Sequence, residues 1–143
     1  MIGAAILQPV VALLAWTMVM WVWMYATRLP AMAKAGIDGK TMVGSTGASL
    51  RAKLPDTVSW KADNYNHLHE APTLFYAVAL VLAIIGQGDG LNAAIAWAYV
   101  ALRVAHSLVQ ATSNRVVIRF ALFALSTLAL MALILHAAIA VFH

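Results

Sequence analysis

The chain has 143 residues, of which 64% are hydrophobic and only 10% are charged, whereas a soluble domain is about 45–50% apolar and about 25% charged. This composition excludes an ordinary soluble domain and predicts an all-α integral membrane protein, with room for about four spanning helices of ~20 residues each. The formal charge of +4 does not indicate a nucleic-acid partner, because the basic residues gather in the loops that flank apolar runs. The lack of cysteine excludes disulfides, thiolate metal sites and a cysteine nucleophile.

The first predicted span covers residues 4–27, because Ala4 to Ala26 is one uncharged apolar run. No basic segment precedes this run and no small-residue cleavage site ends a short apolar core, so we expect a retained helix and not a signal peptide. The polar stretch from Arg28 to Trp60 comes next, rich in glycine, and predicts a loop with a short surface helix. The glycines at 44 and 47 stand without the lysine of a phosphate loop, so no nucleotide site is expected.

The second predicted span covers residues 64–86 and is polar in its first half. A helix that begins near Trp60 brings Asp63, Asn66 and Glu70 onto one face. Pro72 removes a helix hydrogen bond, so we expect a kink there. On such a helix, His67 and His69 point about 200° apart, and we therefore expect no metal site.

The third and fourth predicted spans cover residues 91–112 and 116–142. In the third span Arg103, His106 and Gln110 stand on one helix face. A charged side chain at membrane depth costs roughly 2.5–3.5 kcal/mol on insertion scales, and such a residue normally faces the protein interior or a polar cavity. The sequence therefore predicts an intramembrane polar site, within a bundle of four transmembrane helices.

Lysine and arginine occur in the first and third connections and are absent from residues 87–90. The positive-inside rule then places these two connections in the cytoplasm and both termini on the other side. The polar halves of the second and third spans, with the start of the fourth, share the cytoplasmic half.

Charge balance indicates which class of ligand the polar site binds. Glu70 is the one acid near membrane depth, whereas three arginines, at 103, 115 and 119, face it. The surplus positive charge suits an anion such as a carboxylate, phosphate or thiolate. Two structural alternatives stay open: Glu70 neutralises Arg103 between helices, and Arg115 and Arg119 anchor the fourth helix at the cytoplasmic surface.

These residues resemble the MAPEG family, the membrane-associated proteins in eicosanoid and glutathione metabolism, in a bacterial-type form. The resemblance covers nearly the whole chain and is carried by Asn66, Glu70, Pro72, Leu74 and Phe75, by Arg103-Val-Ala-His106, and by Arg119. It implies a homotrimer of four-helix subunits in a membrane, here the bacterial inner membrane. Glutathione would lie between neighbouring subunits in the cytoplasmic half, and lipophilic substrates would enter from the bilayer lipids.

The resemblance also implies roles for the cationic residues. Arg119, with Arg115, would stabilise the glutathione thiolate. Arg103 and Lys61 would hold the carboxylates of glutathione. Lys61 is the nearest basic residue where the family usually carries an arginine before its asparagine.

The remaining candidate residues would complete glutathione binding. Glu70 and Asn66 would take the amino group and the amides, although the two are four residues apart here and usually three apart in the family. His106 would orient Arg103 or donate to a reacting oxygen. Gln110 stands where a tyrosine often comes four residues after the helix-three histidine.

Two functions are consistent with this pattern. The first is a glutathione-dependent transferase or peroxidase that acts on lipophilic substrates at subunit interfaces. The alternative is a non-catalytic structural or accessory subunit, which keeps the MAPEG scaffold and packs against lipid or a larger membrane complex. The departures in the second span favour the alternative, and glutathione binding discriminates between the two.

Overall fold

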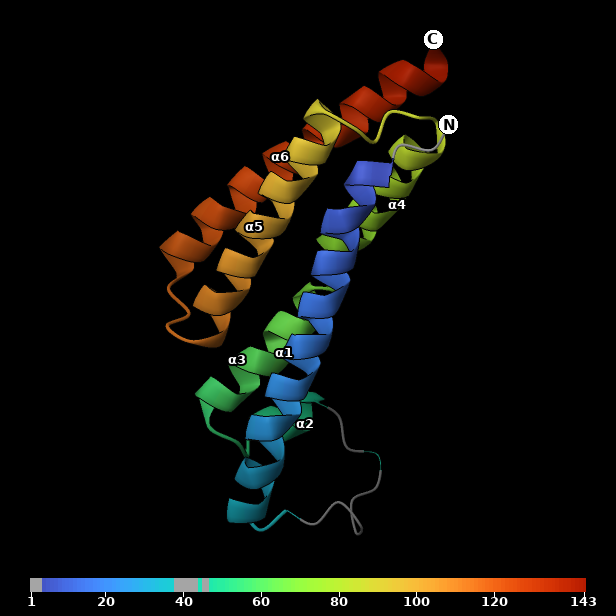
Figure 1. Ribbon diagram of the computed structural model, residues 1–143. Coiled ribbons are helices and arrows are strands. Elements are labelled where there is room, and N and C mark those ends of the chain that lie inside the picture. Colours follow the sequence, from blue (N-terminus) through green and yellow to red (C-terminus); the bar gives the residue numbers. More distant parts are fainter. Residues whose placement is uncertain (1–3, 38–43, 45–46) are drawn as a thin grey trace.

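The computed structural model describes residues 4–37, 44 and 47–143, and within them every regular element is a helix. Part of the glycine-containing segment considered for nucleotide binding therefore lies outside the described residues. The elements are a 3₁₀ turn, Ala4–Ile6, followed by α1 (Leu7–Lys34), α2 (Gly47–Arg51), α3 (Asp56–His67), α4 (Ala71–Ile84), α5 (Leu91–Ala111) and α6 (Val116–Phe142). The helices run side by side as an elongated bundle (Figure 1).

The first helix is longer than the apolar run that predicts it. It continues through Arg28 and Pro30 to Lys34. Its buried residues include Val10, Leu13 and Thr17, spaced three and four apart as for a helix with one face in the core. Thr17 donates its hydroxyl to the Leu13 carbonyl at 2.9 Å, so this buried polar group is satisfied within the helix.

The second predicted span divides into α3 and α4, with a break over residues 68–70. Pro72 has no N–H to give to the Leu68 carbonyl, and its ring clashes with that carbonyl in a continuous helix. The chain instead tightens, with the Glu70 N–H donating to the His67 carbonyl at 3.1 Å. The bend therefore precedes the proline by two to four residues and moves Glu70 off the helix face predicted for it.

Aromatic and aliphatic side chains join α1, α4 and α5. Phe75 and Tyr99 are fully buried, and their rings stack with centroids 4.5 Å apart. Leu13 and Leu82 belong to the same core cluster. Both termini and the α4–α5 turn lie at one end of the bundle, while α2, α3 and the α5–α6 turn lie toward the other end (Figure 1).

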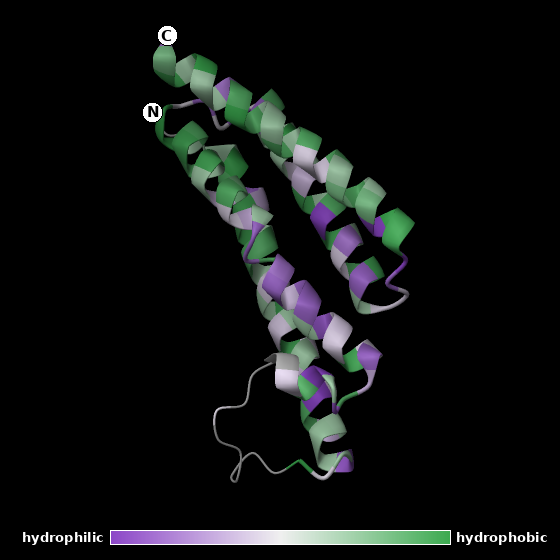
Figure 2. Cartoon of the chain, turned by 180° about the vertical axis from the view of Figure 1, so that it is seen from behind, coloured by the Kyte–Doolittle hydropathy of each residue, from purple (hydrophilic) through white to green (hydrophobic). Residues whose placement is uncertain are grey.

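Three stretches of the described chain are long and apolar enough to cross a membrane: residues 4–34, residues 56–84 and α6. On α6, Val117 is 81% exposed and Phe120 is 70% exposed, as expected for side chains that face lipid. The α5 helix is not one of the three, although its 21 residues span about 32 Å at ~1.5 Å per residue. Figure 2 shows the reason, because hydrophilic residues interrupt the lower half of α5.

Candidate functional site

A pocket of about 250 Å³ opens between the α3–α4 break, α5 and α6. Its lining combines polar side chains from α3, the break, α5 and α6 with apolar side chains, mainly from α6. The lining residues are His67, Glu70, Ala71, Arg103, His106, Val116, Arg119, Phe120 and Phe123. The pocket thus gathers Glu70, Arg103, His106 and Arg119, four of the residues predicted for the site.

The α5 helix contributes two buried polar side chains, Arg103 and His106, which are 2% and 5% exposed. Arg103 donates from Nη2 to the backbone carbonyl of His67 at 3.4 Å. Its Nε and the Nδ1 of His106 have no protein hydrogen-bond partner among the described residues. Buried polar groups are normally paired, so these two unpaired nitrogens mark an incompletely satisfied polar cluster beside the pocket.

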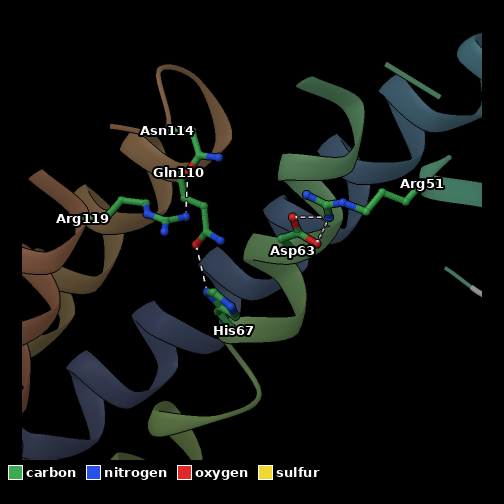
Figure 3. A network of polar contacts seen from close by, with 6 residues as sticks. All are labelled: Arg51, Asp63, His67, Gln110, Asn114 and Arg119. Atoms are coloured by element: carbon green, nitrogen blue, oxygen red, sulfur yellow. Dashed lines mark hydrogen bonds and ion pairs between the residues drawn. The ribbon is translucent and has the colours of Figure 1, made fainter. Parts of the chain in front are cut away.

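The end of α3 is fixed to α5 by a second contact. His67 Nδ1 lies 3.1 Å from Gln110 Oε1, and the Gln110 side chain is 1% exposed. Figure 3 shows the two side chains pointing toward one another across the helices. Gln110 therefore lies behind the pocket and holds one of its walls.

Arg119 reaches the pocket from the first turn of α6. Its Nη1 donates to Asn114 Oδ1 at 2.7 Å, and its Nε has no protein partner among the described residues. Asn114 has φ of 51°, a left-handed conformation that asparagine tolerates better than most residues. The α5–α6 turn thereby fixes the guanidinium through Asn114 (Figure 3), and Arg119 lines the pocket.

Glu70 lines the pocket without pairing with Arg103. Its side chain is exposed, and among the described residues the one ion pair joins Arg51 to Asp63 at 2.7 Å. The predicted alternative in which Glu70 directly neutralises Arg103 is thus not what the structure shows. Asp63 is turned toward Arg51 (Figure 3) and does not line the pocket. Its hydrogen bond with Arg51 raises the pKa of that arginine.

Four predicted site residues do not line the pocket. Lys61 donates to the backbone carbonyls of Thr57 and Ala111 at 3.1 and 3.2 Å and covers the Trp23 ring at 5.3 Å. Asn66 and Arg115 are exposed. Gln110 touches His67. These residues support the pocket or face away from it.

His67 is the polar lining residue that the sequence motifs did not assign to the site. The sequence presents it as a possible metal ligand with His69, whereas the family resemblance points to Asn66. The spacing held a signal, because His67 stands three residues before Glu70, the distance usual in the family for its asparagine. No sequence motif pointed to the apolar lining residues, such as Val116 and Phe120.

The pocket favours an anionic ligand with an apolar part. Arg103 and Arg119 bring two guanidinium groups to it, and Glu70 brings its one carboxylate. Phe120 and Phe123 form an apolar side along α6. Guanidinium groups bind carboxylates, phosphates and other anions through charge-assisted hydrogen bonds.

Comparison with known proteins agrees with the sequence. The model of the MAPEG family matches residues 6–139 of this chain. No curated protein and no solved structure matches it.

Proposed function

This chain belongs to the MAPEG family, and on that premise we propose that it binds glutathione in the pocket and uses the thiolate on a lipophilic substrate. The observation that carries the proposal is the gathering of Arg103 and Arg119 around one cavity with a single carboxylate, Glu70. Glutathione carries two carboxylates, one ammonium group and a thiol that reacts as the anion. The pocket offers cations in excess and one acid, as such a ligand requires.

Arg119 is the residue assigned to the thiolate. It is partly buried, its orientation is set by Asn114, and its Nε is free of protein partners among the described residues. A fixed positive charge at the sulfur favours the thiolate over the thiol. Phe120 and Phe123 on the same helix would face the lipophilic substrate.

Arg103 and Glu70 are assigned to the two ends of the peptide. Arg103 would bind a carboxylate through its guanidinium, which lines the pocket, and His106 beside it would orient that guanidinium or donate to a reacting oxygen. Glu70, exposed at the helix break, would accept the ammonium group.

The site is proposed to be completed by a neighbouring subunit in a homotrimer. A volume of about 250 Å³ is below the ~300–1,000 Å³ of ordinary ligand pockets. The mouth beside Phe120 is open, since that side chain is 70% exposed. Asn66 and Arg115, exposed on this chain, are then available to a neighbour's pocket.

The proposed setting is the bacterial inner membrane, with α5 as a fourth span. Packing of α5 on α6 and α1 shields its polar face, whose buried residues include Arg103, His106, Ser107 and Gln110. A helix of this composition crosses a bilayer only when such a face is covered by protein.

The test is titration of the detergent-solubilised protein with glutathione, followed by assays with an electrophilic aryl halide and a lipid hydroperoxide. Millimolar glutathione should raise the melting temperature, because a ligand that binds the native state stabilises it. One of the two substrates should then be consumed with glutathione. The control tripeptide, S-methylglutathione, should bind without turnover.

The rival function is the accessory subunit without catalysis. The position of Lys61, Asn66 and Arg115 outside the pocket favours it, since one chain then presents only part of a glutathione site. Wild-type protein that neither gains stability from glutathione nor consumes either substrate would overturn the glutathione proposal and favour the rival.

A further inference from the structure

We propose that His67 is the group that takes the proton from the thiol bound in this pocket, and that Gln110 is the positioning residue that prepares it. The inference rests on the proposed glutathione function and adds to it the path of the proton. It is carried by one hydrogen bond, by the burial of Gln110, and by the place of His67 in the pocket wall.

The hydrogen bond fixes which nitrogen of His67 is basic. Gln110 presents its amide oxygen to His67 Nδ1 at 3.1 Å, and an amide oxygen only accepts hydrogen bonds. Nδ1 therefore carries the hydrogen in the neutral ring, and Nε2 carries the lone pair. Gln110 is 1% exposed, so water does not compete for this contact.

The His67 backbone is held as well as its ring. Its carbonyl accepts from Arg103 Nη2 at 3.4 Å and from the Glu70 N–H at 3.1 Å. The residue is thus fixed between α5 and the α3–α4 break, on the wall of the cavity that Arg119 also lines. A proton acceptor fixed in this way needs little rearrangement when the thiol arrives.

The other histidines nearby lack this preparation. His106 lines the pocket, but no protein group among the described residues pairs with its Nδ1. His69 has its Nδ1 at 2.9 Å from the Tyr65 carbonyl and is exposed outside the pocket. His67 is therefore the histidine that combines a set tautomer with access to the ligand.

The proton step balances within the pocket. The thiol S–H bond breaks, the proton forms a bond with His67 Nε2, and the electron pair stays on sulfur as the thiolate beside Arg119. The imidazolium then lies in the wall of the pocket that Glu70 also lines. When the thiolate attacks an electrophile, His67 returns the proton to the leaving group or to the developing anion of the substrate.

Charged and titratable groups surround His67 in the pocket wall. The charged and titratable groups around the cavity are Glu70 from the break, Arg103 and His106 from α5, and Arg119 from α6. On α3 itself Lys61 donates to the Ala111 carbonyl, and the Trp23 ring of α1 packs against that lysine. Glu70 is the one acid in this set and the partner suited to the imidazolium.

The experiment measures thiolate formation in the complete protein by stopped-flow ultraviolet absorbance after mixing with glutathione, across a range of pH. We expect His67→Asn to bind glutathione, by calorimetry, within about threefold of wild type. Positioned acid–base groups contribute ~10²–10⁴-fold, so thiolate formation should slow by about 100-fold or more. Added imidazole should restore part of the rate in His67→Ala.

Two further variants make the result specific. Gln110→Leu, which removes the acceptor, should slow ionisation and change its pH profile, while Gln110→Glu, which keeps an acceptor oxygen, should retain most of the rate. His69→Asn is the matched control outside the pocket and should behave as wild type. If His67→Asn fails to fold, these two Gln110 variants still test whether the Gln110–His67 pair promotes ionisation of the thiol.

The outcomes separate this proposal from the one on which it rests. Wild-type protein that binds glutathione and ionises it, with His67→Asn equally fast and imidazole without effect, overturns the role of His67 and leaves the glutathione function intact. Wild-type protein that binds no glutathione overturns both.

Discussion

Arg103 on α5 donates to the backbone carbonyl of His67, the last residue of α3, across 3.4 Å. This contact exists because the helix breaks before Pro72 and leaves the His67 carbonyl without its usual helical donor, the N–H of residue 71. It joins a buried cation to the one irregular segment of the second apolar stretch. The pocket is built around this junction.

The first prediction concerns Arg103→Met, which keeps a long side chain and removes the charge. Arg103 is 2% exposed and makes a single long hydrogen bond among the described residues, so burying its charge costs more than this contact returns. We expect the melting temperature to stay constant or rise. Glutathione affinity should fall by about 10–100-fold, as for the loss of a charge-assisted hydrogen bond of ~1.5–3 kcal/mol.

Arg103→Lys is the control that keeps the positive charge but loses the bidentate hydrogen bonding of the guanidinium. This variant should bind glutathione with intermediate affinity. A large drop in melting temperature for Arg103→Met, with unchanged glutathione affinity, would contradict the assignment and make Arg103 a structural residue.

The second prediction separates the effect of the Arg119 charge from the effect of the hydrogen bond by which Asn114 holds it. Arg119→Ala should lower the rate by ~10²–10³, as for other preorganised charges at a developing anion. Its melting temperature should change little, since the side chain is only partly buried. Steady-state kinetics with saturating glutathione and differential scanning fluorimetry measure the two effects.

Asn114→Gly is the matched control for this variant. Glycine accepts the positive φ of residue 114 while removing the Oδ1 that holds Arg119 at 2.7 Å. The charge remains but becomes mobile, so a smaller loss, of about tenfold, is expected. Equal activity in wild type and Arg119→Ala would leave Arg119 as a membrane anchor.

The third prediction concerns the helix break. Pro72→Ala restores an N–H that can donate to the Leu68 carbonyl, so α3 and α4 should join. In the joined helix the N–H of residue 71 donates to the His67 carbonyl, which then no longer accepts from Arg103. We expect a gain in helical circular dichroism together with weaker glutathione binding, and a variant that binds like wild type would show that the break does not build the site.

The fourth prediction is the orientation in the membrane. Both termini and the α4–α5 turn share one end of the bundle (Figure 1), and that turn carries no lysine or arginine, whereas the other two connections do. Reporter fusions at His143 should therefore read as non-cytoplasmic, and an insertion between Ser113 and Asn114 as cytoplasmic. The opposite pattern would remove the proposed cytoplasmic location of the pocket.

The fifth prediction is the assembly. If a neighbour completes the open mouth beside Phe120, native mass spectrometry in detergent should find three copies of the 15.3 kDa chain. Phe120→Lys, placed on that 70%-exposed side chain, should weaken the trimer. A monomer that binds glutathione with full affinity would show that one chain suffices.

The sequence by itself determined the class of this protein. Long apolar runs cannot be buried in a chain of this size without a bilayer, and the spacing of Arg103, His106 and Gln110 places them on one face through helix periodicity alone. The local chemistry of Pro72 also predicted a bend, because a missing N–H is a property of the residue itself. Family membership was visible in the same residues, and the match over residues 6–139 confirmed it.

Only the tertiary structure decided which polar residues meet. Asn66 and Asp63 share the predicted polar face with Glu70, yet Asn66 is exposed and Asp63 pairs with Arg51, while His67 enters the pocket. The reason is geometric: the break over residues 68–70 turns α4 relative to α3, and contact between α3 and α5 selects the partners. Periodicity assigns residues to a face of one helix, and packing between helices decides what that face touches.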